Sequence, residues 1–152
     1  MIRHCTAAVI GILAVISLSS AYAQTATDKV APAQREVLLQ ADHSWNGVAY
    51  THYPTGRPQL TMLKLTLAPH SKLPWHTHPF PNAGYVLSGT LTVHDKVSGK
   101  TKVFHQGEAF AETVDDIHRG ETGDEPTVLL VTYSGTPGVP TSIPAKGEQK
   151  EY

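Results

Sequence analysis

Residues 74–93 read PWHTHPFPNAGYVLSGTLTV. Two apolar runs, at residues 84–87 and 91–93, flank a Ser-Gly-Thr turn, which predicts two strands joined by a tight hairpin. His76 and His78 stand a few residues earlier. In an extended strand residues i and i+2 point to the same side, so both imidazoles can reach one point. Since imidazole binds several divalent metals at neutral pH, the pair is a candidate for metal ligation.

Short strand-like runs continue on both sides of this stretch. Leu63, Leu65 and Leu67 alternate with other residues and give the period of two that is typical of a strand. Further runs stand at residues 36–39, 47–50, 102–104, 107–111 and 127–133. They recur roughly every 8–12 residues, and no window of a dozen residues has an apolar period of 3.6. We therefore predict an all-β fold, a sandwich or barrel in a single domain.

The first residues have the pattern of a secretory signal peptide. A positively charged start leads into an apolar run at residues 7–18 and then into Ala21-Tyr22-Ala23, which matches the three regions of such a peptide. The run is shorter than the roughly 20 residues of a spanning helix, and no cysteine follows it to carry a lipid. We expect cleavage after Ala23, a periplasmic or secreted location, and no membrane anchor.

Cleavage after residue 23 would leave 129 of the 152 residues, which is the size of one domain. We expect residues 24–34 to be a flexible lead and residues 35–134 to form the barrel. Residues 135–152 are rich in Pro and Gly and are expected to be a tail, either wrapped on the surface or disordered. The run at residues 36–39 could add to the sheet of a second copy, so we also expect a homodimer.

The composition of the shortened chain excludes several classes of function. Without Arg3 it holds 11 Lys and Arg against 13 Asp and Glu, a formal net charge of −2. Nucleic acids call for a clustered basic excess, so we expect no nucleic-acid partner. The single cysteine, Cys5, is also removed, which excludes disulfides, thiolate nucleophiles and cysteine-ligated metals. Imidazole remains as the soft metal ligand, on eight histidines.

The spacing after the histidine pair resembles the first motif of the cupin family, G-x5-H-x-H-x3,4-E-x6-G. His76, His78 and Gly89 match it, whereas Asn82 stands in place of the glutamate and His70 in place of the leading glycine. Only 17 residues separate Gly89 from the start of the second motif. That short distance is similar to the spacing in small single-domain members of the family.

The second cupin motif, G-x5-P-x-G-x2-H-x3-N, resembles the stretch from Gly107 to His118. Thr113 stands in place of the proline, Asp115 in place of the glycine, and Thr122 in place of the final asparagine. Aspartate tolerates the left-handed backbone conformation better than most residues, so the change at Asp115 is mild for the fold.

This resemblance implies a double-stranded β-helix, or cupin jelly-roll, barrel, which agrees with the strand pattern. It also implies one divalent metal ion (Fe, Zn, Cu, Mn or Ni) held by His76, His78, His118 and, in the fourth position, Asn82. An amide oxygen brings no charge, so the metal would keep its +2 charge, act as a stronger Lewis acid and attract an anionic ligand. The alternative is a cupin barrel that has lost its metal site.

Aromatic residues near the motifs have two interpretations. Trp75, Phe80, Tyr85 and Phe110 could line a substrate pocket for a ring-bearing ligand. They could equally fill the core of the barrel, which needs the same residue types.

Acidic residues just before the last motif histidine also have two interpretations. One of Glu112, Asp115 and Asp116 could orient a ligating imidazole through its second nitrogen. A solvated acidic turn is the alternative.

The signal-peptide pattern predicts export, and the resemblance implies a mononuclear metal-binding protein that binds or transforms a small anionic or oxygenated metabolite. Cupins with three histidines and no glutamate suggest dioxygenase-type chemistry, whereas a zinc ion would suit an isomerase or lyase. A non-catalytic protein of the cell envelope that binds a metal or small ligand is the alternative. The sequence leaves open whether the protein is an enzyme.

Overall fold

The computed structural model describes residues 33–152, so the predicted signal peptide and most of the predicted lead lie outside the described residues. The described chain is built from strands and loops: β1 (Gln59–Leu67), β2 (His76–Thr77), β3 (Asn82–Ser88), β4 (Thr90–Asp95), β5 (Thr101–His105), β6 (Ala109–Ala111), β7 (His118–Thr122), β8 (Thr127–Gly135) and β9 (Ile143–Pro144). Within residues 33–152, no helix is long and apolar enough to span a membrane.

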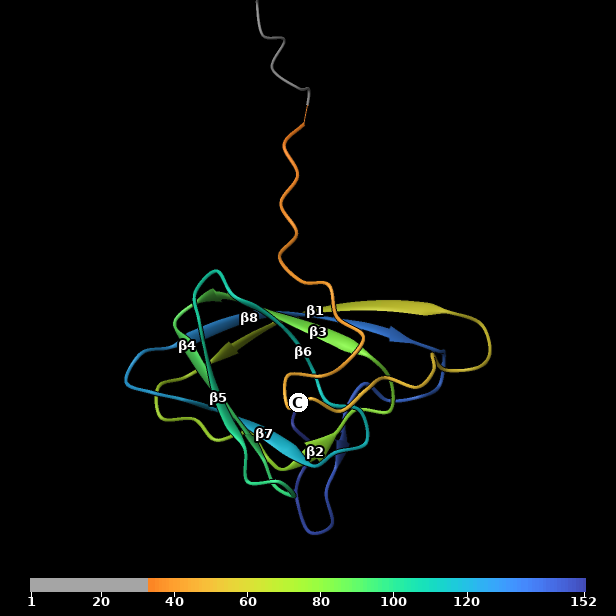
Figure 1. Ribbon diagram of the computed structural model, residues 1–152. Coiled ribbons are helices and arrows are strands. Elements are labelled where there is room, and N and C mark those ends of the chain that lie inside the picture. The colour runs from red at the N-terminus through yellow and green to blue at the C-terminus, as the bar shows by residue number, and fades with distance from the viewer. Residues whose placement is uncertain (1–32) are drawn as a thin grey trace, which may run out of the picture. The chain divides into compact units, whose positions relative to one another are not determined.

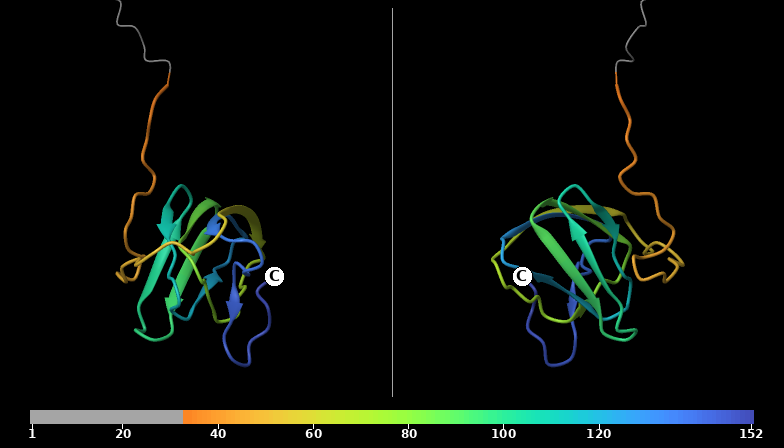
Figure 2. Two further views of the ribbon diagram at one scale, coloured as in Figure 1. Left: turned by 90° about the vertical axis from the view of Figure 1, so that its right-hand side faces the viewer. Right: turned by 60° about the vertical axis from the view of Figure 1, so that its left-hand side comes forward.

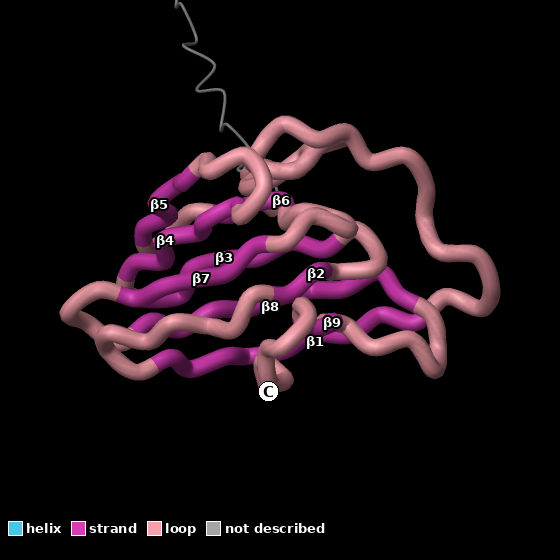
Figure 3. The backbone as a smooth tube through the Cα atoms, turned by 90° about the horizontal axis from the view of Figure 1, so that it is seen from below, coloured by secondary structure: helices cyan, strands magenta, loops and turns pink. Residues whose placement is uncertain are grey.

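Two sheets face each other across the interior of the barrel. One has the strand order β1-β8-β3-β6 and the other the order β5-β4-β7-β2-β9. Figure 1 looks into the ring that the two sheets enclose, and Figure 3 shows the same strands from below, joined by loops. Neighbouring strands run antiparallel. This arrangement confirms the all-β, double-stranded β-helix prediction.

The hydrophobic core lies between the sheets and follows the period of two. In β3, β4 and β8, buried positions alternate with partly exposed ones, because successive side chains of a strand point to opposite faces. The core consists of Phe80, Val86, Leu91, Val93, Phe104, Phe110, Leu129, Val131 and Tyr133. Of the apolar runs that predicted strands, those in β1, β3, β4, β5, β6 and β8 are confirmed.

The runs at residues 36–39 and 47–50 form no strands, so these two predictions were wrong. Val37 and Leu38 are about half exposed, and the region holds a single isolated bridge, between His43 and Ala49. An apolar run becomes a strand only where a neighbouring strand accepts its backbone hydrogen bonds. Within the described residues, no strand forms a hydrogen-bonded ladder with either run.

A C-terminal segment, residues 136–152, returns to the barrel after β8. Its strand β9 pairs with β2, with Thr77 opposite Ile143, and the backbone N–H of Ala145 donates to the carbonyl of Trp75 at 2.8 Å. In Figure 1 the C-terminus lies within the ring of strands, and both views of Figure 2 show it at one end of the barrel. The C-terminal segment is therefore hydrogen-bonded to β2 and to the residue before it, next to His76.

Candidate metal centre

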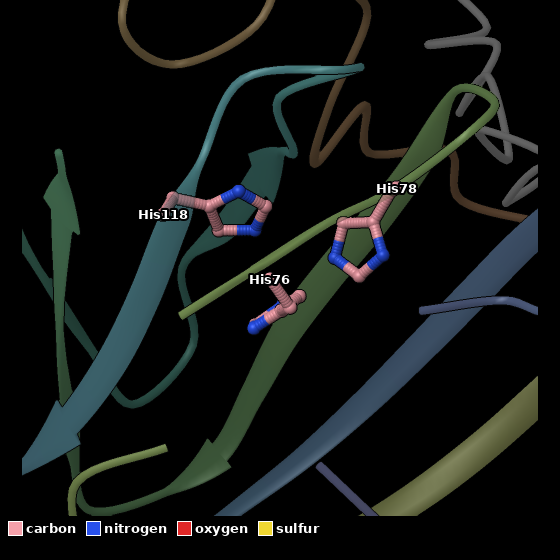
Figure 4. Close-up of side chains that lie close together, drawn as sticks. All are labelled: His76, His78 and His118. Atoms are coloured by element: carbon pink, nitrogen blue, oxygen red, sulfur yellow. The ribbon is translucent and has the colours of Figure 1, made fainter. Parts of the chain in front are cut away.

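Three histidines meet inside the barrel, as the motif spacing predicts. His76 in β2 lies directly opposite His118 in β7 in antiparallel register, and His78 follows two residues after His76. All three side chains are buried, and their ring centroids lie 4.5 to 4.9 Å apart. One ring nitrogen of each lies within 4.8 Å of the others, and Figure 4 shows the rings gathered around a common space. These distances fit ligation of a single metal ion.

The loop between β6 and β7 brings the second motif to the first. Asp115 adopts a positive φ of 62°, in the left-handed region that its motif position requires. Its backbone N–H donates to the carbonyl of His78 at 3.0 Å, and Val114 bridges to the same residue. His70, at the leading glycine position of the first motif, also has a positive φ, of 56°. Both departures from glycine thus keep the backbone conformation of the motif.

The second nitrogen of each imidazole is held by a protein acceptor. Nδ1 of His76 lies 2.9 Å from the carbonyl of Pro74, and Nδ1 of His78 lies 2.7 Å from the carbonyl of Thr141. A carbonyl oxygen only accepts, so each Nδ1 carries the hydrogen. The lone pair therefore lies on Nε2, which is the tautomer that a metal centre needs.

His118 is oriented by two acceptors rather than one. Its Nδ1 lies 2.9 Å from the carbonyl of Asp116 and 2.6 Å from the hydroxyl of Thr113. Thr113, the residue that replaces proline in the motif, thus contributes a hydroxyl to the orientation of His118. Of the three acidic residues Glu112, Asp115 and Asp116, it is Asp116 that holds the second nitrogen, and it does so through its backbone carbonyl rather than its carboxylate.

Burial keeps the three imidazoles neutral. Removal from water lowers the pKa of His76, His78 and His118, most strongly for His78. Neighbouring imidazoles lower the pKa of His76 and His78 further, since two imidazolium ions this close would repel. Neutral imidazole is the form that binds a metal, so little proton competition is expected near neutral pH.

Two carboxylates reach the histidines from different parts of the chain. Oε2 of Glu112 lies 3.4 Å from Nε2 of His118, and Oε2 of Glu151 lies 3.4 Å from Nε2 of His76. Neither oxygen has a hydrogen-bond partner in the described chain, and neither does Nε2 of His118. Burial raises the pKa of Glu112 to about 7. Unpartnered buried donors and acceptors are rare, and a cation among these atoms would satisfy them together. The residues therefore fit a divalent metal ion.

Asn82 does not share this cavity. Its side-chain NH₂ donates to the carbonyl of Phe80 at 3.3 Å, and its Oδ1 is buried without a partner. It lines a separate pocket of about 330 Å³ together with Tyr50 and Tyr53. Ligation by Asn82 stays a prediction, whereas the carboxylates beside the histidines come from Glu112 and Glu151. The replacement of glutamate by Asn82 predicted that only uncharged groups would surround the metal. The structure instead places two carboxyl side chains beside the histidines.

The histidines face a cavity of about 20 Å³. A space of this size holds about one water molecule. Apolar side chains make most of its wall, and its lining consists of Leu65, Leu73, His76, His78, Leu91, Val93, Glu112, His118, Gly120, Leu129, Val131, Tyr133 and Glu151. The wall keeps bulk water away from the imidazole nitrogens, but a metabolite does not fit while the C-terminal segment lies in this position.

The four aromatic residues considered for a substrate pocket lie outside the lining of this cavity. Phe80 and Phe110 belong to the hydrophobic core. The guanidinium of Arg119 lies over the ring of Trp75, 4.4 Å from its centroid. Tyr85 lies on the face of β3 that alternates with the buried positions. The structure thus gives Phe80 and Phe110 a packing role, and it leaves Trp75 and Tyr85 outside the lining of the histidine cavity.

Glu151 is the residue of this site that the sequence did not indicate. No motif surrounds it, and it lies in a stretch that has the composition of a tail. Glu112 was considered, but for the second imidazole nitrogen rather than for Nε2. The contact of the Thr113 hydroxyl with His118 was also missed, and the available signal for it was the threonine at the proline position of the motif.

Comparison with known proteins supports the same fold. Residues 63–133 match the model of the Cupin domain family, and no curated protein matches the chain. The DMSP lyase DddQ from Ruegeria pomeroyi DSS-3 is 18% identical, with a TM-score of 0.52 over 60% of this chain and 45% of that chain. A structure from work on the DMSP lyases RdDddP and RnDddQII is also 18% identical, with a TM-score of 0.51 over 57% and 44%.

A third solved structure comes from Klebsiella pneumoniae subsp. pneumoniae MGH 78578. It is an uncharacterised conserved protein with a double-stranded β-helix domain, 18% identical, with a TM-score of 0.49 over 64% of this chain and 86% of that chain. This chain spans less than half the length of the two lyase chains. At 18% identity, the likeness to the two lyase chains shows the fold alone.

The family-model match covers the strands from β1 to β8 that carry both histidine motifs. It agrees with the two-sheet barrel and with the three histidines gathered inside it. The described chain is therefore a cupin-like barrel in which residues 63–133 match the Cupin domain family.

Proposed function

We propose that this protein is a mononuclear metal enzyme that acts on a small oxygen-bearing metabolite. The observation that carries the proposal is that one ring nitrogen each of His76, His78 and His118 meets the others within 4.8 Å in buried surroundings, while every Nδ1 is hydrogen-bonded elsewhere. A divalent metal held there would supply a Lewis acid to a bound oxygen atom of the substrate. The apolar wall of the cavity excludes water, which strengthens electrostatic interactions within it.

Glu112 favours an enzyme over a purely binding protein. Its carboxylate lies beside His118 without a hydrogen-bond partner on Oε2. A carboxylate in this position can hold a proton taken from a bound substrate, which is the part of a general base. Proton transfer of the isomerase or lyase kind is therefore one reaction class for this site. Dioxygenase-type oxidation of diketones or phenols, with molecular oxygen as the oxidant, is the other.

The metal site is tested by measuring metal content. Protein produced with added zinc, iron, copper, manganese or nickel should carry about one metal ion per chain. His118→Ala should lose it, because only two imidazoles remain. The matched control is His52→Ala, which removes an exposed histidine in a loop. Sub-stoichiometric metal in the parent protein, unchanged in His118→Ala, would contradict the proposal.

Turnover then separates enzyme from binding protein. The metal-loaded protein is incubated with a panel of diketones, phenols and small hydroxy acids while oxygen uptake and product formation are followed. Oxygen uptake that His118→Ala abolishes supports a dioxygenase, and product without oxygen uptake supports an isomerase or lyase. A flat response to every compound favours a non-catalytic binding protein of the cell envelope.

We also propose that the protein is exported and forms a homodimer. The signal-peptide pattern ending at Ala23 supports export, and sequencing of the mature protein should begin at Gln24. The exposed apolar side chains of Val37 and Leu38 support self-association. Light scattering at micromolar concentration should give the mass of a dimer, and a monomer mass would contradict this part of the proposal.

A further inference from the structure

The C-terminal segment is anchored on both sides of the histidine cluster. Upstream of β9, the carbonyl of Thr141 accepts the hydrogen bond from Nδ1 of His78. Strand β9 then pairs with β2, placing Pro144 opposite His76. A turn follows, in which the N–H of Glu148 donates to the carbonyl of Ala145 at 3.0 Å. The chain therefore reverses direction and comes back toward the barrel.

Tyr152 fixes the return of this segment. Its hydroxyl lies 3.1 Å from the hydroxyl of Tyr133 and 3.0 Å from that of Thr141. Tyr133 is a buried residue of β8 whose ring lies 5.5 Å from the ring of His78, centroid to centroid. The neighbouring residue, Glu151, is thereby held over the histidines rather than in solvent.

The side chain of Glu151 is 5% exposed and lines the same small cavity as the three histidines. Its Oε2 lies 3.4 Å from Nε2 of His76 and has no hydrogen-bond partner in the described chain. A buried carboxylate without a partner is unfavourable, and burial among neutral imidazoles gives it no compensating charge. A cation bound by the imidazoles would supply that charge.

We propose that Glu151 is the carboxylate ligand of the metal centre, delivered by the C-terminal segment to the side of the ion that the three histidines leave open. This inference rests on the proposed metal site. The first motif carries Asn82 where a ligating glutamate is expected, so Glu151 restores from another part of the chain the charge that this substitution removes. Ligation also holds the segment across the cavity, and a substrate must displace Glu151 to reach the metal.

The test compares Glu151→Gln with Glu148→Gln. Both variants remove one negative charge from the same segment, but Glu148 is exposed and lies away from the cavity. Zinc and cobalt affinities are measured by competition with a chromophoric chelator. We expect the metal Kd of Glu151→Gln to rise at least about tenfold, since ligand and supporting residues typically contribute tenfold or more. The Kd of Glu148→Gln should stay within about twofold of the parent value, as expected for a solvated charge.

A second readout follows the segment itself. Lys146 and Lys150 are exposed and open to trypsin. Zinc should slow cleavage at Lys150 in the parent protein and in Glu148→Gln, because the ion holds the next residue in place. In Glu151→Gln, zinc should give no such protection. The visible absorption of the cobalt form should also differ between the parent protein and Glu151→Gln, because the ligand set has changed.

The outcomes separate this inference from the metal site on which it rests. Stoichiometric zinc in the parent protein, with equal affinity, cobalt spectrum and protection in Glu151→Gln, overturns the role of Glu151 alone. A loss of affinity in Glu112→Gln but not in Glu151→Gln would assign the carboxylate ligand to Glu112 and likewise overturn it. A parent protein that binds no metal overturns both proposals.

Discussion

Two buried clusters inside the barrel differ in what they contribute. In the phenylalanine cluster, Phe104 and Phe110 stack with ring centroids 4.4 Å apart, and a Cβ on Gly84 would lie 2.2 Å from the Phe110 ring. In the histidine cluster, equally buried side chains leave Nε2 of His118 and Oε2 of Glu151 without hydrogen-bond partners among residues 33–152. The first cluster is complete in the protein chain alone. The second leaves buried polar atoms unsatisfied within residues 33–152, which is the usual difference between packing and a site.

The largest expected effect belongs to the phenylalanine cluster. Phe110→Ala should lower the free energy of unfolding by about 3–5 kcal/mol, because it removes a buried ring and leaves a cavity. Urea unfolding measures this loss, and Phe110→Leu should lose less. Metal content should remain near one ion per chain in the folded fraction. A loss below about 1 kcal/mol would indicate that the surrounding side chains readily fill the space left by the ring, or that Phe110 is not packed as described.

Zinc binding at the histidine cluster should change the free energy of unfolding by a somewhat smaller amount. At a free zinc concentration about 100 times the Kd, binding to the folded state alone should raise the free energy of unfolding by about 2.7 kcal/mol. Chelation should reverse the effect. The same urea titration on His118→Ala should show no stabilisation by zinc. Equal stabilisation of this variant would mean that the ion binds elsewhere on the chain.

The smallest effect concerns the orientation of one ligand. Thr113→Val removes the hydroxyl that lies 2.6 Å from Nδ1 of His118 but leaves the carbonyl of Asp116 in place. Zinc affinity should fall about tenfold, at the low end for loss of a group that supports a ligand. Thr113→Ser keeps the hydroxyl and should bind zinc nearly as tightly as the parent protein. If both variants bind alike, the hydroxyl has no part in orienting His118.

The phenylalanine cluster and most strands could be predicted from the sequence because the signal is local. In β4 the buried Leu91 and Val93 alternate with partly exposed threonines and His94, so the period of two is visible. In β7, which reads HRGET, the buried positions are His118, Gly120 and Thr122. None of them is a large apolar residue, so the hydrophobic period of the sequence does not indicate this strand.

The histidine cluster could be predicted only in part. Motif spacing singled out His76, His78 and His118, and the structure brings them together. The carboxylate beside His76 comes from Glu151, far along the chain, and its place depends on the pairing of β9 with β2 and on the contact of Tyr152 with Tyr133. Such contacts depend on the tertiary fold rather than on local pattern, so composition suggested a tail.

The hydrogen bond between His78 and Thr141 also makes the histidine cluster depend on a distant part of the chain. The carbonyl that selects the tautomer of His78 belongs to a residue 63 positions later in the chain. The two histidine motifs end at residue 122, so the acceptor that orients His78 lies outside them. The motifs alone therefore do not define the arrangement of Nε2 lone pairs, which also requires the docked C-terminal segment.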